Sequence, residues 1–127
     1  MTDTGYHEPT GELSAETRSL HRTLRTVMEE LEAVDWYQQR ADVETDEELK
    51  SILIHNRDEE IEHAAMALEW LRRRVPQFDE MFRTYLFTEA PVVTIEESQE
   101  GETEEKDTGS SGRSHTDLGI GKLDVGD

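Results

Sequence analysis

Residues 45–74 read TDEELKSILIHNRDEEIEHAAMALEWLRRR, and most of the predicted architecture follows from this stretch. Thr45-Asp46-Glu47-Glu48 has the pattern of a capping box, which predicts the start of a helix. The arginines at 72–74 complement the negative end of a helix dipole, and Pro76 then stops the helix. Between these ends, one stripe recurs at alternating steps of four and three residues, as in a helix that packs along a partner: Leu49, Leu53, Asn56, Glu60, His63, Ala67 and Trp70.

A long helix is also predicted upstream, over residues 15–41, because this segment contains no glycine or proline. Ser14 is a suitable N-cap, and Glu16 places negative charge in the first turn. The apolar stripe of this helix alternates in the same way: Leu20, Leu24, Val27, Leu31 and Val34. The link near residues 42–44 is short, which predicts an antiparallel hairpin. A shorter third helix is predicted over residues 77–87, so the expected fold class is all-α.

The composition points to a small domain that needs help to be stable. The chain has 127 residues, of which 33% are hydrophobic and 35% are charged. Such a chain buries little apolar surface alone, and a metal or oligomerisation usually makes up the difference. There is no cysteine, which excludes disulfides and thiolate metal sites. We expect a soluble cytoplasmic protein, because neither a signal peptide nor an apolar run of roughly 20 residues is present.

The formal net charge of −18 indicates which kinds of partner the chain can bind. Nucleic-acid binding needs basic surface, so we expect no nucleic-acid partner. An acidic surface concentrates cations near its clefts, which favours a metal ion as the ligand. Solubility or a salty habitat is the alternative explanation of the charge.

The chain is predicted to divide into three parts. Residues 1–94 form a helical domain. Residues 95–116 form an acidic linker that is rich in serine, threonine and glycine and is expected to lack regular structure. Residues 117–127 form a tail in which spaced apolar residues return, as in a short anchor for the groove of another protein: Leu118, Ile120 and Leu123.

Polar side chains interrupt the seam of the second long helix, where apolar residues are expected. Glu60 and His63 are three residues apart and share one face, which suits two ligands of one ion. Glu30 lies on a stripe of the first helix with apolar residues one turn away on either side. In an antiparallel hairpin these three side chains fall near mid-helix and meet at one level. A buried, salt-bridged Glu–His pair is the main structural alternative.

One chain supplies only part of a metal centre. Two carboxylates and one imidazole are too few to hold a redox metal well, whereas two chains supply four carboxylates and two imidazoles. Bundles that bind two metal ions use that larger set, spread over four helices. Oxygen and nitrogen ligands suit iron, manganese or zinc. Iron follows from the two-metal carboxylate pattern, and the simplest completion is a second copy of the chain.

Other side chains near this pattern allow two interpretations each. Glu29 and Glu32 could collect cations or form a solvated acidic face. Trp36 and Tyr37 could lie beside the metal centre or serve in plain packing. A further polar face on the second helix is interpreted as solvated, and it comprises His55, Glu59 and Glu62.

Three stretches resemble the encapsulated ferritins, two-helix ferritin-like proteins that are carried inside encapsulin nanocompartments. They are residues 28–37 (MEELEAVDWY), 55–66 (HNRDEEIEHAAM) and 85–88 (YLFT). The resemblance runs from about His7 to Pro91. The tail resembles the peptide that docks such cargo on the inner wall of the shell, through Leu118, Gly119, Ile120, Gly121, Lys122 and Leu123.

The resemblance implies a hairpin that dimerises into a ferritin-like four-helix bundle, with dimers assembled into an annular decamer. It implies a ferroxidase, with Glu30, Glu60 and His63 as iron ligands and catalytic residues, and with two irons at each dimer interface. Two further pairs would lie around this centre: Glu29 and Glu32 as an acidic site through which iron arrives, and Trp36 and Tyr37 beside the centre. The encapsulin shell, inside the cytoplasm, would hold the iron mineral.

Two other functions compete with this interpretation. The chain could be a structural adaptor, in which the polar seam residues fix the register of the helices. It could also be a metal carrier that binds iron or zinc without oxidising it. An oxygen carrier of the haemerythrin type is disfavoured, because it needs many histidines and only His63 lies in the seam.

Overall fold

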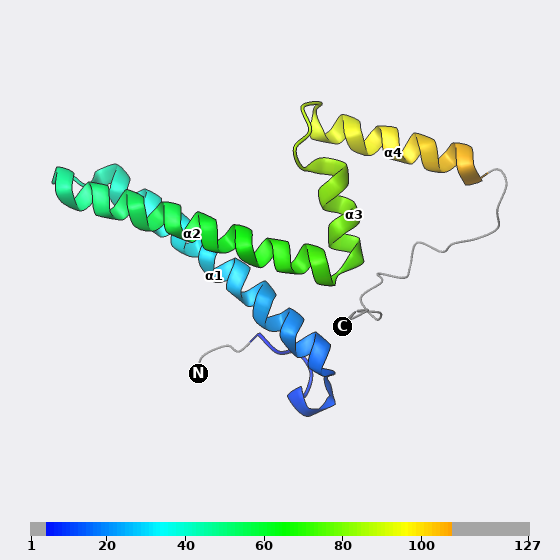
Figure 1. Cartoon of the computed structure of the whole chain (residues 1–127), viewed down its shortest axis with the longest axis horizontal. Helices are drawn as coiled ribbons and strands as arrows, with labels where there is room; N and C mark the ends of the chain where they lie inside the picture. Colours follow the sequence, from blue (N-terminus) through cyan, green and yellow to red (C-terminus); the bar gives the residue numbers. More distant parts are fainter. Residues whose placement is uncertain (1–4, 108–127) are drawn as a thin grey trace. The chain divides into compact units, whose positions relative to one another are not determined.

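The computed structural model describes residues 5–107, with side chains up to residue 101. The elements of this part are a 3-10 turn η1 (Thr10–Glu12) and four helices: α1 (Ala15–Val43), α2 (Glu47–Arg74), α3 (Pro76–Tyr85) and α4 (Val92–Asp107) (Figure 1). The all-α prediction is confirmed, as are the two long helices and the short third one. The chain divides into two compact units, Met1–Leu71 and Arg72–Asp127. No helix in the described part has the length and apolar character needed to cross a bilayer.

Helix α1 begins where the sequence predicts. Ser14 caps it, because its Oγ accepts a hydrogen bond of 3.1 Å from the backbone N–H of Thr17. The segment before the cap folds back on the helix, and the ring of Tyr6 stacks on His21 with centroids 4.0 Å apart. Gly5 has φ +73°, and a Cβ at this position would lie 3.1 Å from Cε1 of His21. A glycine is therefore required for this approach.

The link between α1 and α2 is tied by two carboxylates. Oε1 of Glu44 accepts hydrogen bonds from the backbone N–H groups of Thr45 and Asp46, at 3.1 and 3.0 Å. Oδ1 of Asp46 then accepts from the N–H of Leu49 at 2.8 Å, which makes Asp46 the cap of α2. The predicted capping box had Thr45 as the N-cap, so the observed cap, Asp46, lies one residue later. In a capping box the N–H of Thr45 would bond to the side chain of Glu48, but here it donates to Glu44.

The two long helices form the predicted antiparallel hairpin. Figure 1 shows α1 and α2 side by side from the link to mid-helix, after which they diverge. Gln38 near the end of α1 accepts a hydrogen bond of 2.6 Å from Arg57 in the third turn of α2. Glu30, two turns earlier on α1, faces His63, two turns later on α2. This register places the middles of both helices at one level.

Within one chain, the predicted apolar seam of α1 is buried only in part. The side facing α2 carries Val27 and Ala41 as buried residues, while Leu24 and Leu31 remain 37% and 53% exposed. Leu24 and Leu31 lie on a neighbouring face of the helix, which also carries the exposed Met28. A single partner helix covers one side of α1 only, so the two neighbouring rows cannot both be buried within one chain.

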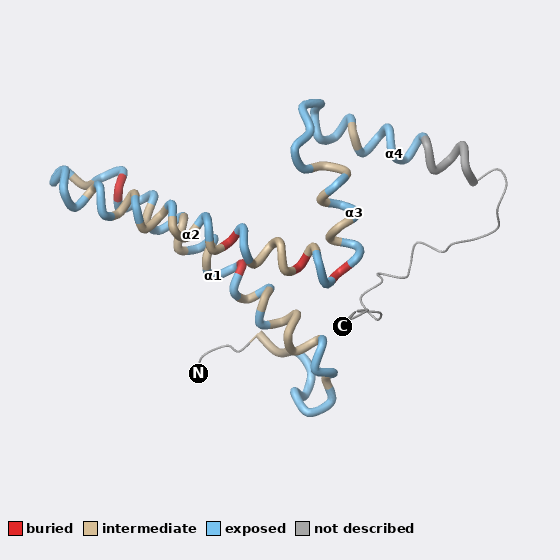
Figure 2. The backbone as a smooth tube through the Cα atoms, in the orientation of Figure 1, coloured by how far each residue is buried: buried red, intermediate tan, exposed pale blue. Residues whose placement is uncertain are grey.

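The core of the described part is small. Its buried hydrophobic residues are Val27, Ala41, Ala64, Leu71 and Val75 (Figure 2). Large apolar side chains remain exposed on both long helices. A hairpin with so little burial gains too little free energy to be stable by itself, which indicates that other surfaces cover it.

The second unit begins with charged contacts around α3. Pro76 occupies the first turn of this helix, where a missing N–H costs nothing. Asp79 accepts hydrogen bonds from Arg72 at 2.6 Å and from Arg83 at 2.9 Å. Phe87, after the end of α3, has φ +60° and is fully exposed.

Helix α4 departs from the expectation that residues after 95 lack regular structure. Its first turn forms as the N–H of Ile95 bonds to the carbonyl of Pro91 at 3.1 Å. The stretch from Val92 to Glu100 has no glycine or proline, and glutamate is a good helix former, so acidic composition does not prevent a helix here. The division into a domain, a linker and a tail stays a prediction. The proposed tail lies outside the described residues.

Candidate metal centre

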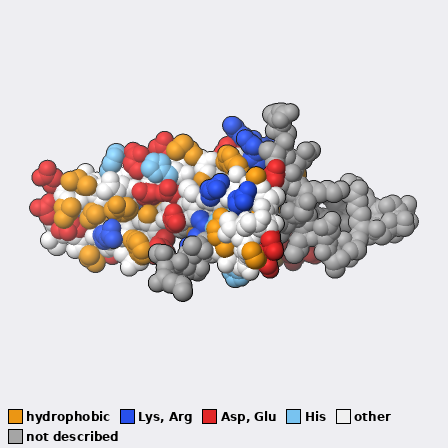
Figure 3. Space-filling view, turned by 90° about the horizontal axis from the view of Figure 1, so that it is seen from below, with side chains coloured by type: hydrophobic (Ala, Val, Ile, Leu, Met, Phe, Trp, Pro, Cys, Tyr) orange, Lys and Arg blue, Asp and Glu red, His pale blue; other side chains and the backbone are white. Residues whose placement is uncertain are grey.

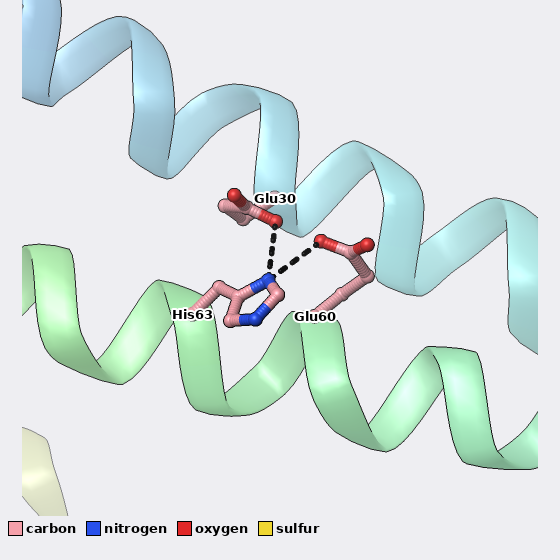
Figure 4. Close-up of side chains that lie close together, drawn as sticks. All are labelled: Glu30, Glu60 and His63. Atoms are coloured by element: carbon pink, nitrogen blue, oxygen red, sulfur yellow. Dashed lines mark ion pairs between the residues drawn. The ribbon is translucent and has the colours of Figure 1, made fainter.

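Three predicted ligands come together in the middle of the hairpin. Glu30 lies on α1, while Glu60 and His63 lie one turn apart on α2 (Figure 4). Nδ1 of His63 is 3.7 Å from Oε2 of Glu30 and 3.5 Å from Oε2 of Glu60. Figure 4 shows both carboxylates turned toward this nitrogen from different helices. Among the residues that the structure describes, these three form a group whose ligand atoms all lie within 4.8 Å of one another.

These distances leave room for an ion. Hydrogen bonds between nitrogen and oxygen span about 2.7–3.2 Å, so the separations of 3.5 and 3.7 Å are too long. A transition metal lies about 2.1 Å from each nitrogen or oxygen ligand, so two ligands of one ion stand about 3–4 Å apart. The three side chains therefore already lie close to the spacing that a shared ion needs.

The group is short of positive charge. Glu30 and Glu60 are only 21% and 24% exposed, and His63 is 43% exposed. Within the described part of the chain, His63 is the one basic side chain that pairs with either glutamate. Two partly buried carboxylates beside one imidazole favour a bound cation, because a carboxylate removed from water needs a counter-charge.

The structure does not gather the other predicted residues into this group. Glu29 and Glu32 are exposed on α1, as a solvated face would be. Trp36 is half exposed. Tyr37 is partly buried, and the guanidinium of Arg40 lies 5.2 Å from the centroid of its ring. Their predicted roles around the centre remain predictions, as does docking through residues 118–123, which the structure does not describe.

Glu59 is a neighbour of the centre that the sequence analysis missed. Its Oε2 lies 4.0 Å from Nε2 of His63, and its Oε1 lies 3.5 Å from Nε2 of His55. The three side chains follow one another at steps of four residues along α2. The spacing of four residues between His55, Glu59 and His63 is visible in the sequence. It does not differ from the spacing on a solvated helical face, such as the face that carries the exposed Glu62.

Exposed apolar side chains border this side of the hairpin. Ile52 and Met66 stand seven residues before and after Glu59, so the three share one face of α2, and both apolar side chains are about half exposed. Figure 3 shows hydrophobic side chains over the hairpin interleaved with acidic ones and histidine. Apolar exposure next to a cluster of ligands is typical of an interface rather than of open surface.

Comparison with known proteins identifies the family. The EncFtn-like family matches residues 5–89, which covers α1, α2 and α3. The chain belongs to the EncFtn-like family. This membership confirms the resemblance to encapsulated ferritins, and it agrees with a function that involves iron.

Relatives in the EncFtn-like family are similar over nearly the whole chain. The chain is 53% identical to an encapsulated ferritin-like protein of Rhodospirillum rubrum over 120 residues, which covers 92% of this chain and 86% of the relative. It is 52% identical to a ferritin-like protein of Thermotoga maritima over 118 residues, 93% and 96% of the two chains. A crystal structure of a Nitrosomonas europaea protein aligns with a TM-score of 0.68 and 60% identity, over 69% of this chain and 97% of that one.

Proposed function

We propose that this protein is a ferroxidase that oxidises Fe(II) to Fe(III) at a two-iron centre formed between two copies of the chain. The observation that carries the proposal is the convergence of Glu30, Glu60 and His63, with room for an ion and a deficit of positive charge. Membership of the EncFtn-like family supports iron as the metal. The formal charge of −18 supports a cationic substrate.

A second copy would complete the ligand set. Three ligands leave a redox metal under-coordinated, whereas a two-fold pair of hairpins brings four carboxylates and two imidazoles to two ions. The half-exposed Ile52 and Met66, on the face of α2 that carries Glu59, supply apolar surface for such a pairing. A separate row of exposed apolar side chains on α1, Leu24, Met28 and Leu31, supports a further contact between dimers. An annular decamer built from dimers would need such a contact.

The chemistry follows from the charge of the ligands. Fe(II) is the substrate, and each ion gives up one electron on becoming Fe(III). Carboxylates bind the more highly charged Fe(III) better than Fe(II), so Glu30 and Glu60 lower the free energy of the oxidised state and of the path toward it. With dioxygen as the acceptor, two Fe(II) ions and two protons yield two Fe(III) ions and one hydrogen peroxide.

Two further pairs of side chains would assist the centre, one by collecting Fe(II) and the other by packing beside the ligands. Glu29 and Glu32 are exposed carboxylates next to Glu30 in the sequence, which suits a site where Fe(II) arrives. Trp36 and Tyr37 follow within two turns and would pack beside the centre. Neither pair is required to hold the ions themselves.

We further propose that an encapsulin shell encloses the protein in the cytoplasm and stores the oxidised iron as mineral. One relative is named as an encapsulated ferritin-like protein. The anchor would be residues 118–123, which carry spaced apolar side chains in an otherwise polar tail. Deletion of residues 117–127 should abolish loading into co-expressed encapsulin and leave Fe(II) oxidation in solution unchanged. Undiminished loading would contradict the role of the tail.

The first experiment measures Fe(II) oxidation by absorbance in air-saturated buffer, with equal concentrations of the wild type, Glu60→Ala, His63→Ala and the exposed control Glu62→Ala. We expect fast oxidation in the wild type and the control, and the rate of free iron in the two ligand variants. A wild type that binds Fe(II) but does not exceed the free-iron rate would indicate a carrier. A wild type that neither binds nor oxidises iron would indicate a structural adaptor.

A further inference from the structure

The two ring nitrogens of His63 face different partners. Nδ1 points at the carboxylates of Glu30 and Glu60, at 3.7 and 3.5 Å. Nε2 faces Oε2 of Glu59, at 4.0 Å. The glutamates therefore divide into two groups, one on each side of the imidazole.

This division matters because a neutral imidazole has one nitrogen with a free lone pair and one that carries hydrogen. Only the first can bind a metal ion. Histidines that bind metals usually donate the other N–H to a carboxylate or a carbonyl, which sets the tautomer and the orientation of the ring. On His63, the nitrogen available for such a bond is Nε2, and the carboxylate beside it is Glu59.

Glu59 also lies near a second imidazole. Its other oxygen, Oε1, lies 3.5 Å from Nε2 of His55, one turn earlier on α2. The carboxylate thus stands between two imidazoles at steps of four residues, the spacing at which helical side chains meet. The separation of 4.0 Å from His63 is about 1 Å longer than a hydrogen bond, so the contact requires an adjustment of the Glu59 side chain, which is 46% exposed.

We propose that Glu59 is a positioning residue that accepts the Nε2–H of His63 and so keeps Nδ1 free to bind the metal ion. The inference rests on the proposed function, because it assigns His63 as a ligand. It adds a residue that does not touch the metal. Glu62, three residues further along the same helix, is exposed and offers a matched carboxylate without this contact.

Binding of Co(II), followed by its visible absorption, tests the proposal without relying on oxidation. The full chain would be titrated as wild type, Glu59→Ala, Glu59→Gln, Glu62→Ala and His63→Ala. We expect Glu59→Ala to weaken Co(II) binding about 10- to 100-fold, as losses of such supporting carboxylates do. Glu59→Gln keeps a carbonyl oxygen as acceptor and should recover most of the affinity. Glu62→Ala should bind like the wild type.

The Nε2–H of His63 gives a second readout that a merely structural role would not move. Proton and ¹⁵N spectra of the protein loaded with diamagnetic Zn(II), in which Nδ1 would bind the ion, should show a slowly exchanging Nε2–H in the wild type and in Glu59→Gln, and a faster exchange in Glu59→Ala. Wild-type Co(II) affinity and an unchanged exchange rate in Glu59→Ala, with binding lost in His63→Ala, would overturn the role of Glu59 and leave the proposed function intact. A wild type that fails to bind either Co(II) or Fe(II) would overturn both.

Discussion

Two clusters of charged side chains, one in each unit, are arranged in opposite ways. In the first unit, Glu30 and Glu60 face His63 at 3.7 and 3.5 Å. In the second unit, Arg72 and Arg83 face Asp79 at 2.6 and 2.9 Å. The first cluster has more negative than positive groups and spacings too long for hydrogen bonds. The second has more positive than negative groups and short, charge-assisted hydrogen bonds.

The difference separates a binding cluster from a structural one. The hydrogen bond from Arg72 is the largest cause of the lowered pKa of the Asp79 carboxyl. Desolvation opposes this effect, and the hydrogen bond from Arg83 lowers the pKa further by a smaller amount. That cluster is complete without a ligand. Among the described residues, none donates a comparable hydrogen bond to Glu30 or Glu60, so a cation is the group that would complete this cluster.

The largest effect is expected from removing the excess negative charge. The double variant Glu30→Gln/Glu60→Gln keeps the shape of both side chains but loses both charges. Its affinity for Co(II) should fall more than about 100-fold, since direct ligands matter more than their supporting groups. The metal-free hairpin should melt at a higher temperature, because two partly buried carboxylates no longer repel each other.

The matched control for this variant is Glu62→Gln/Glu80→Gln, which removes the same charge from exposed positions. This control should change neither the Co(II) affinity nor the melting temperature by a comparable amount. A double variant in the hairpin that melts at a lower temperature than the wild type would contradict the contrast, because the glutamates would then be stabilising partners of His63.

Metal ions should also drive assembly of the hairpin. At the proposed interface between two chains, four carboxylates would oppose association until cations neutralise them. Light scattering of the metal-free wild type should therefore give a smaller mass than the same sample with Fe(II) or Co(II). The variant Glu30→Gln/Glu60→Gln should have one mass in both conditions. An identical mass for the wild type with and without metal would count against a centre shared between chains.

A moderate effect is expected at Phe87, where the second unit stores backbone strain. Its φ of +60° is the left-handed region that glycine adopts without cost at the end of a helix. Its side chain is 104% exposed, so Phe87→Gly loses no packing within the chain. The metal-free protein should gain about 0.5–1 kcal/mol in the free energy of unfolding, the relief of strain less the entropy that glycine adds.

The control for Phe87 is Phe87→Ala, which keeps the strain and removes the aromatic ring. It should leave the stability of the metal-free protein almost unchanged. A loss of stability in both variants would mean that the ring is covered in solution, and light scattering would then show whether a second copy covers it.

The smallest effect is expected at Asp79. Because its folded pKa is lowered, the stability that it contributes is present above the unfolded pKa of about 3.9 and is lost as the pH falls through the folded value. Amide exchange of α3 at pH 7 should therefore be faster in Asp79→Asn than in the wild type. The difference should vanish at low pH, where both side chains are neutral. A difference that persists unchanged in acid would contradict the role of the ion pairs.

The sequence predicted the candidate centre better than it predicted the packing around it. The Glu-x-x-His step and Glu30 were recognisable because ligand spacing along a helix is a local property. The sequence left open which row of α1 faces α2, since Leu24 and Leu31 fit a periodic stripe as well as the residues around Glu30 do. Glu59 was missed because its spacing to His55 and His63 resembles that of any solvated helical face. Helix α4 was missed because a glutamate-rich sequence is typical both of disorder and of helix, and Gly101 within α4 weakens the helical signal.

The sequence alone predicted the two long helices, the Ser14 cap and the candidate metal ligands on these helices. Each of these features depends only on neighbours within one or two helical turns. The meeting of Glu30 with Glu60 and His63 was expected from the sequence, but its distances and the side of His63 that each glutamate faces depend on the register and rotation of α1 against α2. These are set by which side chains interlock across the hairpin, and periodicity leaves several rotations open. Only the folded arrangement distinguishes the carboxylates that would hold a metal ion from the one that would hold the imidazole.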